Sequence, residues 1–105
     1  MPQFAVYRNR NPASRSRFPL LLDIQSDLLE PLATRVVIPL TPATTARTRE
    51  MGTLIPVLRF EGKEYLVLTP QVAGIPANEL GPIAGDLTSE RDAIIAAVDF
   101  LLAAI

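Results

Sequence analysis

Short apolar runs separated by prolines make up most of the chain before residue 87. The ten prolines are spread along this part rather than clustered. Proline breaks a helix interior and fits poorly into a central strand, so a long helix has almost no room here. The runs between the prolines are rich in Val, Ile and Leu, which is typical of strands. The pattern predicts a small, mostly β body.

The predicted strands are short and follow one another closely. They cover Gln3–Tyr7, Phe18–Ile24, Arg35–Leu40, Leu54–Phe60 and Glu64–Thr69, with a further short segment near Val72–Pro76. The first of them alternates, because successive side chains of a strand point to opposite faces. Phe4 and Val6 are therefore expected on one face, and Gln3, Ala5 and Tyr7 on the other.

Three connections between these strands are informative. Glu61-Gly62-Lys63 is short and contains a glycine, which predicts a β-hairpin. Arg8–Arg17 combines four arginines with Asn, Pro and Ser, and is predicted to be a loop between the first two strands. Thr41–Gly52 is polar and rich in threonine, and is predicted to be a second loop.

The segment from Thr88 to Ile105 changes character, because it contains neither Pro nor Gly. Thr88 or Ser89 can act as the N-cap of a helix, and acidic residues in the first turn suit the helix dipole. From Ala93 onward, only Asp99 is polar. We predict a C-terminal helix over about residues 88–105.

The predicted helix is apolar on more than one side. One stripe contains Ile94, Val98, Leu101 and Ile105, and the flanks add Ile95, Ala96, Leu102 and Ala103. A helix that packs once against a sheet needs an apolar stripe of only about 100°. The wider apolar surface predicts that a second copy packs against it, giving a homodimer. The segment is too short to span a membrane, since a spanning helix needs about 20 apolar residues.

Length and composition restrict the chemistry. The 105 residues suffice for one domain, which we expect to have a β body at about 1–86 and a helix at about 88–105. The chain has no Cys and no His, which removes thiolate chemistry and the commonest general base and metal ligand. Most hydrolytic mechanisms are therefore disfavoured. The formal net charge of −1 gives no general attraction to nucleic acid or anionic membranes.

A cluster of carboxylates follows the second predicted strand, at Asp23, Asp27 and Glu30. Paired carboxylates can perform acid–base chemistry when their pKa values differ. No nucleophile, phosphate-binding glycine loop or calcium loop accompanies them. We favour a turn in which Asp and Ser oxygens accept backbone N–H groups.

The arginine-rich loop leaves three interpretations open. Its guanidinium groups could contact nucleic-acid phosphates, be simply solvated, or receive an acidic protein partner. The chain has no Trp, and its two tyrosines, Tyr7 and Tyr65, are expected half-buried on strands. A single-strand binding platform, which needs exposed aromatic rings, is therefore disfavoured.

The N-terminal residues contain no basic segment followed by an apolar one, as a secretory signal would. No apolar run reaches the length of a membrane-spanning helix. The absence of cysteine is compatible with a reducing compartment. We expect a cytoplasmic protein.

Several stretches, taken in order, match one known family. They are Gln3–Tyr7, Asp23–Leu29, Arg35–Leu40, Pro56–Leu58, Leu68–Gln71, Gly74–Pro76 and Arg91–Leu101. Their order and spacing resemble the CcdB family, the toxins of ccd type II toxin–antitoxin systems. The resemblance covers essentially the whole chain.

The resemblance implies an SH3-like small β-barrel with a C-terminal helix, assembled as a homodimer whose interface includes the helix region. It implies a toxin that is not an enzyme, but binds the A subunit of DNA gyrase and traps the gyrase–DNA cleavage complex. A cognate antitoxin with a disordered C-terminal half would neutralise it. Their complex would repress its own operon, with DNA contacted only through the antitoxin. No cofactor, metal or membrane is implied.

The family's gyrase contact lies at the C-terminal tip, typically a Trp-Gly-Ile ending. The matching residues here are Ala103, Ala104 and Ile105, so only the isoleucine is kept. We expect these three, with Leu101 and Leu102, to contact gyrase by packing. Aromatic anchors often dominate an interface. The chain is therefore either a toxin with compensating contacts or a CcdB-like interaction protein that keeps antitoxin binding and autoregulation but has lost or changed its target.

The antitoxin contact is expected elsewhere on the surface. A disordered acidic segment that folds on binding spreads its contacts over a large area and does not depend on one anchor. We expect the antitoxin to bind at the arginine-rich loop, through Arg8, Arg10, Arg15 and Arg17.

Overall fold

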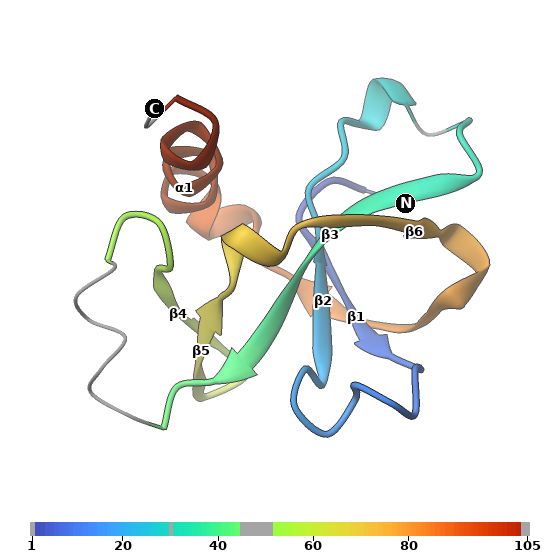
Figure 1. Ribbon diagram of the computed structural model, residues 1–105, viewed down its shortest axis with the longest axis horizontal. Helices are drawn as coiled ribbons and strands as arrows, with labels where there is room; N and C mark the ends of the chain where they lie inside the picture. Colours follow the sequence, from blue (N-terminus) through green and yellow to red (C-terminus); the bar gives the residue numbers. More distant parts are fainter. Residues whose placement is uncertain (1, 30, 45–51, 104–105) are drawn as a thin grey trace.

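A computed structural model describes residues 2–29, 31–44 and 52–103 of the chain (Figure 1). Its strands are β1 (Ala5–Asn9), β2 (Leu20–Asp23), β3 (Thr34–Pro42), β4 (Val57–Phe60), β5 (Lys63–Val67), β6 (Ala73–Pro76) and β7 (Leu80–Asp86), followed by helix α1 (Arg91–Ala103). Among the residues described between the strands, the only helical segments are short 3₁₀ turns. The prediction of a mostly β chain with one C-terminal helix is confirmed.

The strands form one antiparallel sheet in the order β4-β5-β3-β2-β1-β7, with β6 also paired to β3. β3 belongs to two parts of this sheet, because it pairs with β2 on one side and with β6 and then β5 on the other. The larger part consists of β6, β3, β2, β1 and β7, in that order. β6 and β7 lie at its opposite edges, yet only the 3₁₀ turn Ala77–Glu79 (η4) separates them along the chain. This short connection requires the sheet to curl into a half-barrel, which Figure 1 shows.

Pro39 lies in the middle of β3 without disrupting the ladder. Close to it, the partner of β3 on one side changes from β6 to β5. The Pro39 carbonyl points to that side and accepts the amide of Leu68 at 3.1 Å. In an antiparallel ladder, the backbone N and C=O of one residue point to the same side. The Pro39 nitrogen, which carries no hydrogen, therefore faces the gap between β6 and β5.

The two faces of the sheet bury two separate clusters. The larger cluster contains Phe4, Val6, Leu20, Leu22, Ile38, Leu40, Leu58, Phe60, Val67, Leu87 and Ile94. The smaller contains Ala5, Tyr7, Leu21, Val37 and Leu80. The alternation predicted for the first strand is confirmed, because Phe4 and Val6 belong to one cluster and Ala5 and Tyr7 to the other. Tyr7 is buried more completely than expected, whereas Tyr65 is half-buried beside the ring of Phe60.

The predicted hairpin is confirmed between β4 and β5. Its turn residues Glu61 and Gly62 have φ angles of 52° and 81°. Two successive residues in the left-handed region are what a two-residue hairpin turn of type I′ requires, and glycine adopts this conformation without steric cost.

α1 covers the larger cluster through one stripe of its surface. Ile94 and Ala97 are fully buried, and Val98 and Leu101 are partly buried. Figure 1 shows the helix at the upper left, at one end of the molecule, where it contacts the 3₁₀ turn Thr69–Gln71 (η3).

The start of the helix differs from the prediction. A 3₁₀ turn, Thr88–Glu90 (η5), precedes α1, and the expected capping by Thr88 or Ser89 is wrong. Instead, a carboxylate oxygen of Asp86 accepts the backbone amide of Thr88 at 2.9 Å. This bond and a second one from the Thr88 side chain hold the pKa of Asp86 below its ordinary value of 3.8. These bonds therefore stabilise the folded protein at pH values above 3.8, and their contribution is lost as the pH falls through the lower pKa that Asp86 has in the folded protein.

β7 is the one strand among the described residues that the sequence pattern does not predict. Gly81, Pro82 and Gly85 are residues typical of turns. In the structure, the glycines allow close approach: a Cβ atom on Gly81 would lie 2.5 Å from the carbonyl oxygen of Arg8. A Cβ atom on Gly85 would lie 2.9 Å from the ring of Phe60. β7 can approach the Arg8 backbone and the Phe60 ring this closely because these two positions carry no side chain.

Replacing Gly85 with alanine should therefore destabilise the fold. The new methyl group would press against the buried Phe60 ring, and overpacking of this kind costs about 1–3 kcal/mol. The φ angle of 159° at Gly85, which residues with a side chain rarely adopt, adds to the destabilisation. Urea denaturation measures the change in the free energy of unfolding. Gly74→Ala is the matched control and should change little, because no atom lies within 4 Å of its added Cβ. Equal stability of the two variants would contradict the packing described for β7.

Candidate interaction surfaces

A buried ion pair joins the end of β2 to the start of β3. The Nε of Arg35 donates to a carboxylate oxygen of Asp23 at 2.8 Å, and both side chains are almost inaccessible to solvent. Burying one of these charges without its partner would be strongly unfavourable. The backbone carbonyl of Asp23 also accepts the amide of Phe4, so this residue connects β1, β2 and β3.

Gln25 extends this network into the loop between β2 and β3. Its backbone amide donates to the second carboxylate oxygen of Asp23 at 3.0 Å. Its side-chain Nε2 donates to the carbonyl of Leu29 at 2.9 Å, and its Oε1 accepts the amide of Val36 at 3.1 Å. One buried side chain thus bonds to the backbone of both the loop and β3.

The loop held in this way displays apolar side chains to solvent. Leu28 is 90% exposed, Leu29 49% and Leu32 51%. Leu28 and Leu29 lie in a 3₁₀ turn, Asp27–Leu29 (η1), at the upper right of Figure 1. We call these three residues the leucine loop. Neighbouring exposed apolar residues often mark a protein–protein contact.

The leucine loop is missed by sequence reasoning, although a signal is present. Its three leucines lie in a segment otherwise marked as a turn by Ser26, Asp27 and Pro31. Apolar residues inside a predicted loop are either buried by the fold or left exposed, and only the structure distinguishes these outcomes.

The interpretation of the carboxylate cluster as a structural turn is supported for the two residues described. Asp23 accepts the amide of Gln25, and a carboxylate oxygen of Asp27 accepts the amide of Gln3 at 2.7 Å. The sequence did not predict that Asp23 would pair with Arg35. Glu30 lies outside the described residues.

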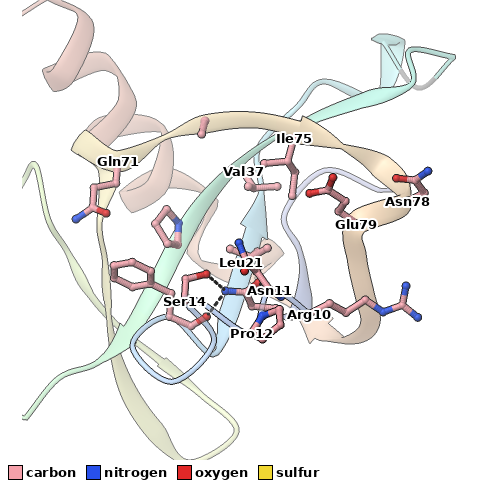
Figure 2. Close-up of a pocket in the computed structure, with 14 residues that line it drawn as sticks. Arg10, Asn11, Pro12, Ser14, Leu21, Val37, Gln71, Ile75, Asn78 and Glu79 are labelled. Atoms are coloured by element: carbon pink, nitrogen blue, oxygen red, sulfur yellow. Dashed lines mark hydrogen bonds between the residues drawn. The ribbon is translucent and has the colours of Figure 1, made fainter.

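A groove of about 650 Å³ lies over the smaller apolar cluster (Figure 2). Leu21, Val37, Pro39 and Ile75 contribute apolar side chains to it. Polar residues from the end of β1, from the arginine-rich loop and from the segment after β6 also line it: Asn9, Arg10, Asn11, Ser14, Asn78 and Glu79. Figure 2 shows the loop on one side of the groove and β6 on the other. An apolar floor with a polar rim is found both in ligand pockets and in protein–protein interfaces.

The arginine-rich loop is shaped by its own hydrogen bonds. The side-chain amide of Asn9 donates to the Ser14 hydroxyl at 3.0 Å and to the carbonyl of Phe18 at 2.8 Å. The side chain of Asn11 accepts the amide of Ala13. The four predicted antitoxin contacts, Arg8, Arg10, Arg15 and Arg17, are all exposed. Arg10 lines the groove, and the guanidinium of Arg17 lies 5.1 Å from the centre of the Phe18 ring.

The predicted gyrase contacts on the helix are only partly accessible. Leu102 is 68% exposed and Ala103 is exposed, whereas Leu101 packs partly against the body. Ala104 and Ile105 lie outside the described residues. Phe100, which was not among the predicted contacts, is 47% exposed and adds an aromatic ring to the same end of the helix.

Within the described ranges, no three His, Cys, Asp or Glu side chains come together as metal ligands would. The same ranges contain no helix with the length and apolar character needed to cross a membrane.

Replacing Arg35 with methionine should strongly destabilise the protein. Methionine preserves most of the aliphatic stem, but it leaves the buried carboxylate of Asp23 without its cation, a change that typically costs about 3–5 kcal/mol. Chemical denaturation provides the measurement. Arg59→Met, which alters an exposed arginine on β4, should change stability by less than about 0.5 kcal/mol. If both variants were equally stable, the ion pair would not have the role assigned to it.

Comparison with models of known protein families relates the chain to one of them. The family model described as CcdB protein matches residues 3–104 of the chain. The match includes the buried ion pair, the leucine loop, the groove and the whole of α1.

Proposed function

Because the chain belongs to the CcdB family, we propose that it is the toxin of a toxin–antitoxin module and that it poisons DNA gyrase. In this proposal it binds the gyrase A subunit and traps the enzyme on cleaved DNA. It acts in the cytoplasm, as a homodimer, and without catalysing a reaction itself. The observation that carries the proposal is the family match over nearly the whole chain.

The proposed gyrase contact combines the leucine loop with the end of the helix. Figure 1 places the two at opposite ends of one chain, so the proposal requires the homodimer, in which the loop of one protomer lies beside the helix end of its partner. Leu101, Leu102, Ala103, Ala104 and Ile105 are its helical part, as the family resemblance implies. The tip contains alanines in place of a large aromatic anchor, so other residues must supply apolar area. Leu28 and Leu29 meet this need, because they are exposed and their backbone is held by hydrogen bonds. A preorganised apolar surface loses less conformational entropy on binding than a flexible one.

The proposed antitoxin contact lies at the groove and the arginine-rich loop. Arg8, Arg10, Arg15 and Arg17 present four positive charges with no carboxylate between residues 8 and 17. The adjacent groove offers apolar side chains such as Ile75 and Leu21. A disordered segment with acidic and apolar residues would be complementary to both. DNA would be contacted through the antitoxin in the repressor complex.

The alanine-containing tip also supports a second candidate from another class. If the contacts are too weak to hold gyrase, the protein is an interaction module that still binds the antitoxin and contributes to autoregulation. The groove and the arginine-rich loop do not include the tip, so this function does not require it.

A gyrase cleavage reaction tests the proposal. Purified protein, gyrase from the same host, ATP and supercoiled plasmid should yield linear DNA once the protein is denatured. Leu28→Asp should reduce the yield at least tenfold, because it places a charge in the proposed apolar contact. Ile83→Asp, at a 57% exposed position on β7, is the matched control and should cleave like the wild type. Absence of cleavage by a wild-type protein that still binds its antitoxin would select the second candidate.

Reversing charge in the arginine-rich loop should weaken antitoxin binding. Arg15→Glu combined with Arg17→Glu replaces two attractive charges with two repulsive ones, and we expect at least a tenfold loss of affinity by calorimetry. The loss should shrink at high salt, because exposed charges are screened. Arg59→Glu with Arg91→Glu changes net charge equally at two other exposed positions and should have little effect. Equal losses for both double variants would assign the effect to net charge rather than to this loop.

A further inference from the structure

We propose that Gln25 is a positioning residue for the target contact, acting through the backbone of the leucine loop. The inference rests on the proposed function, since it concerns how that contact is held in place. Gln25 is 5% exposed and cannot itself be a major contact for a partner. Its influence is instead exerted through Leu28, Leu29 and Leu32.

The hydrogen bonds of Gln25 are directed at the loop. Its Nε2 donates to the carbonyl of Leu29, which ends the 3₁₀ turn, and its Oε1 accepts the amide of Val36, which lies on β3 beyond the loop. A single side chain therefore fixes the turn relative to the sheet. The side-chain amide satisfies two backbone groups that the strand ladder does not reach.

The pairing of β2 and β3 does not depend on this side chain. Four residue pairs connect the two strands, and the amide of Ile24 donates to the carbonyl of Val36 beyond them. The ion pair between Asp23 and Arg35 holds the same end of the sheet. A purely structural role for Gln25 would duplicate bonds that are already present.

The exposure of the leucines indicates the role of the two hydrogen bonds of the Gln25 side chain. Apolar side chains in a flexible loop tend to fold back against the protein and remove their surface from water. Here Leu28 remains 90% exposed although the loop connects two adjacent strands. Ser26 helps to define the turn, since its hydroxyl accepts the amide of Leu28 at 3.2 Å and its carbonyl accepts that of Leu29 at 2.9 Å. Gln25 attaches the turn to the body.

The chain of contacts begins in the protein interior. Arg35 holds one oxygen of Asp23, and the other oxygen holds the backbone amide of Gln25. The amide side chain of Gln25 is therefore oriented before any partner arrives. Preorganisation of this kind favours binding because the loop is already ordered in the free protein.

The test is a double-mutant cycle between Gln25→Met and the pair Leu28→Ala with Leu29→Ala. Affinity for a gyrase A-subunit fragment is measured by calorimetry, and affinity for the antitoxin is measured in parallel. Methionine has a similar length but makes neither hydrogen bond. We expect Gln25→Met to weaken fragment binding about tenfold in the wild-type background, which corresponds to about 1.4 kcal/mol. In the Leu28→Ala, Leu29→Ala background, it should weaken binding by less than twofold.

Two comparisons separate positioning from general stability. Antitoxin affinity of Gln25→Met should stay within twofold of the wild type. Gln3→Met removes a bond of similar length, from Gln3 Nε2 to the carbonyl of Ile24, at the same end of the sheet. It should leave fragment affinity within twofold. An equal loss for Gln25→Met in both backgrounds, or an equal loss for Gln3→Met, would overturn the proposal.

A measurement on the free wild-type protein decides the case if a variant does not fold or if the fragment does not bind. NMR order parameters of the backbone at residues 26–29 should be about 0.85, the value of rigid backbone. Values below about 0.6 would show a mobile loop and would overturn the positioning role. Failure of the wild type to bind the fragment contradicts the proposed target, whereas a mobile loop contradicts this inference.

Discussion

The buried pair of Asp23 and Arg35 is the constraint on which the arrangement of the strands depends. The two charges lie at the end of β2 and the start of β3, where no solvent reaches them. Neither can be buried alone, so the two strands can pair in only one register. The same aspartate accepts the amide of Gln25 and, through its carbonyl, the amide of Phe4. Asp23 thus connects β1, β2 and β3, and it also binds Gln25, whose side chain holds the leucine loop.

The main apolar core and the groove lie on different faces of the sheet. One face of the sheet, closed by α1, contains the larger apolar cluster. The other face is only partly covered, and its groove lies between the arginine-rich loop and β6 (Figure 2). The leucine loop and the end of α1 provide exposed apolar groups away from this groove. A chain without His or Cys thereby offers two chemically different surfaces, one apolar and one cationic with an apolar floor, which suits the two partners proposed above.

The sequence predicted the parts of the fold that local patterns determine. Alternation placed Phe4 and Val6 opposite Ala5 and Tyr7, and the glycine of the hairpin turn marked the β4–β5 connection. β7 was missed because Gly81, Pro82 and Gly85 have the composition of a turn. Those glycines are required by the Arg8 backbone and the Phe60 ring, which are distant in sequence. No local pattern contains that information.

The candidate surfaces were predictable to different degrees. Composition alone predicts that the arginines are exposed, and all four are, although Arg8 lies on β1 rather than in the loop. The pairing of Asp23 with Arg35 could not be predicted from the sequence, because the two residues are twelve positions apart and meet only when β2 pairs with β3. The exposure of Leu28 likewise depends on the turn and its attachment. The alanines near the C-terminus were evident from the sequence, but their consequence depends on how much apolar surface the rest of the protein supplies.

Hydrogen–deuterium exchange of the wild-type protein, with and without the gyrase A-subunit fragment, tests the central claim most directly. The claim is that the leucine loop and the end of α1 together form the target contact. It predicts slower exchange on binding at residues 26–33 and 99–103, with the arginine-rich loop unchanged. Protection confined to the arginine-rich loop and β6, with the leucine loop unaffected, would contradict it and would place the target on the surface assigned here to the antitoxin.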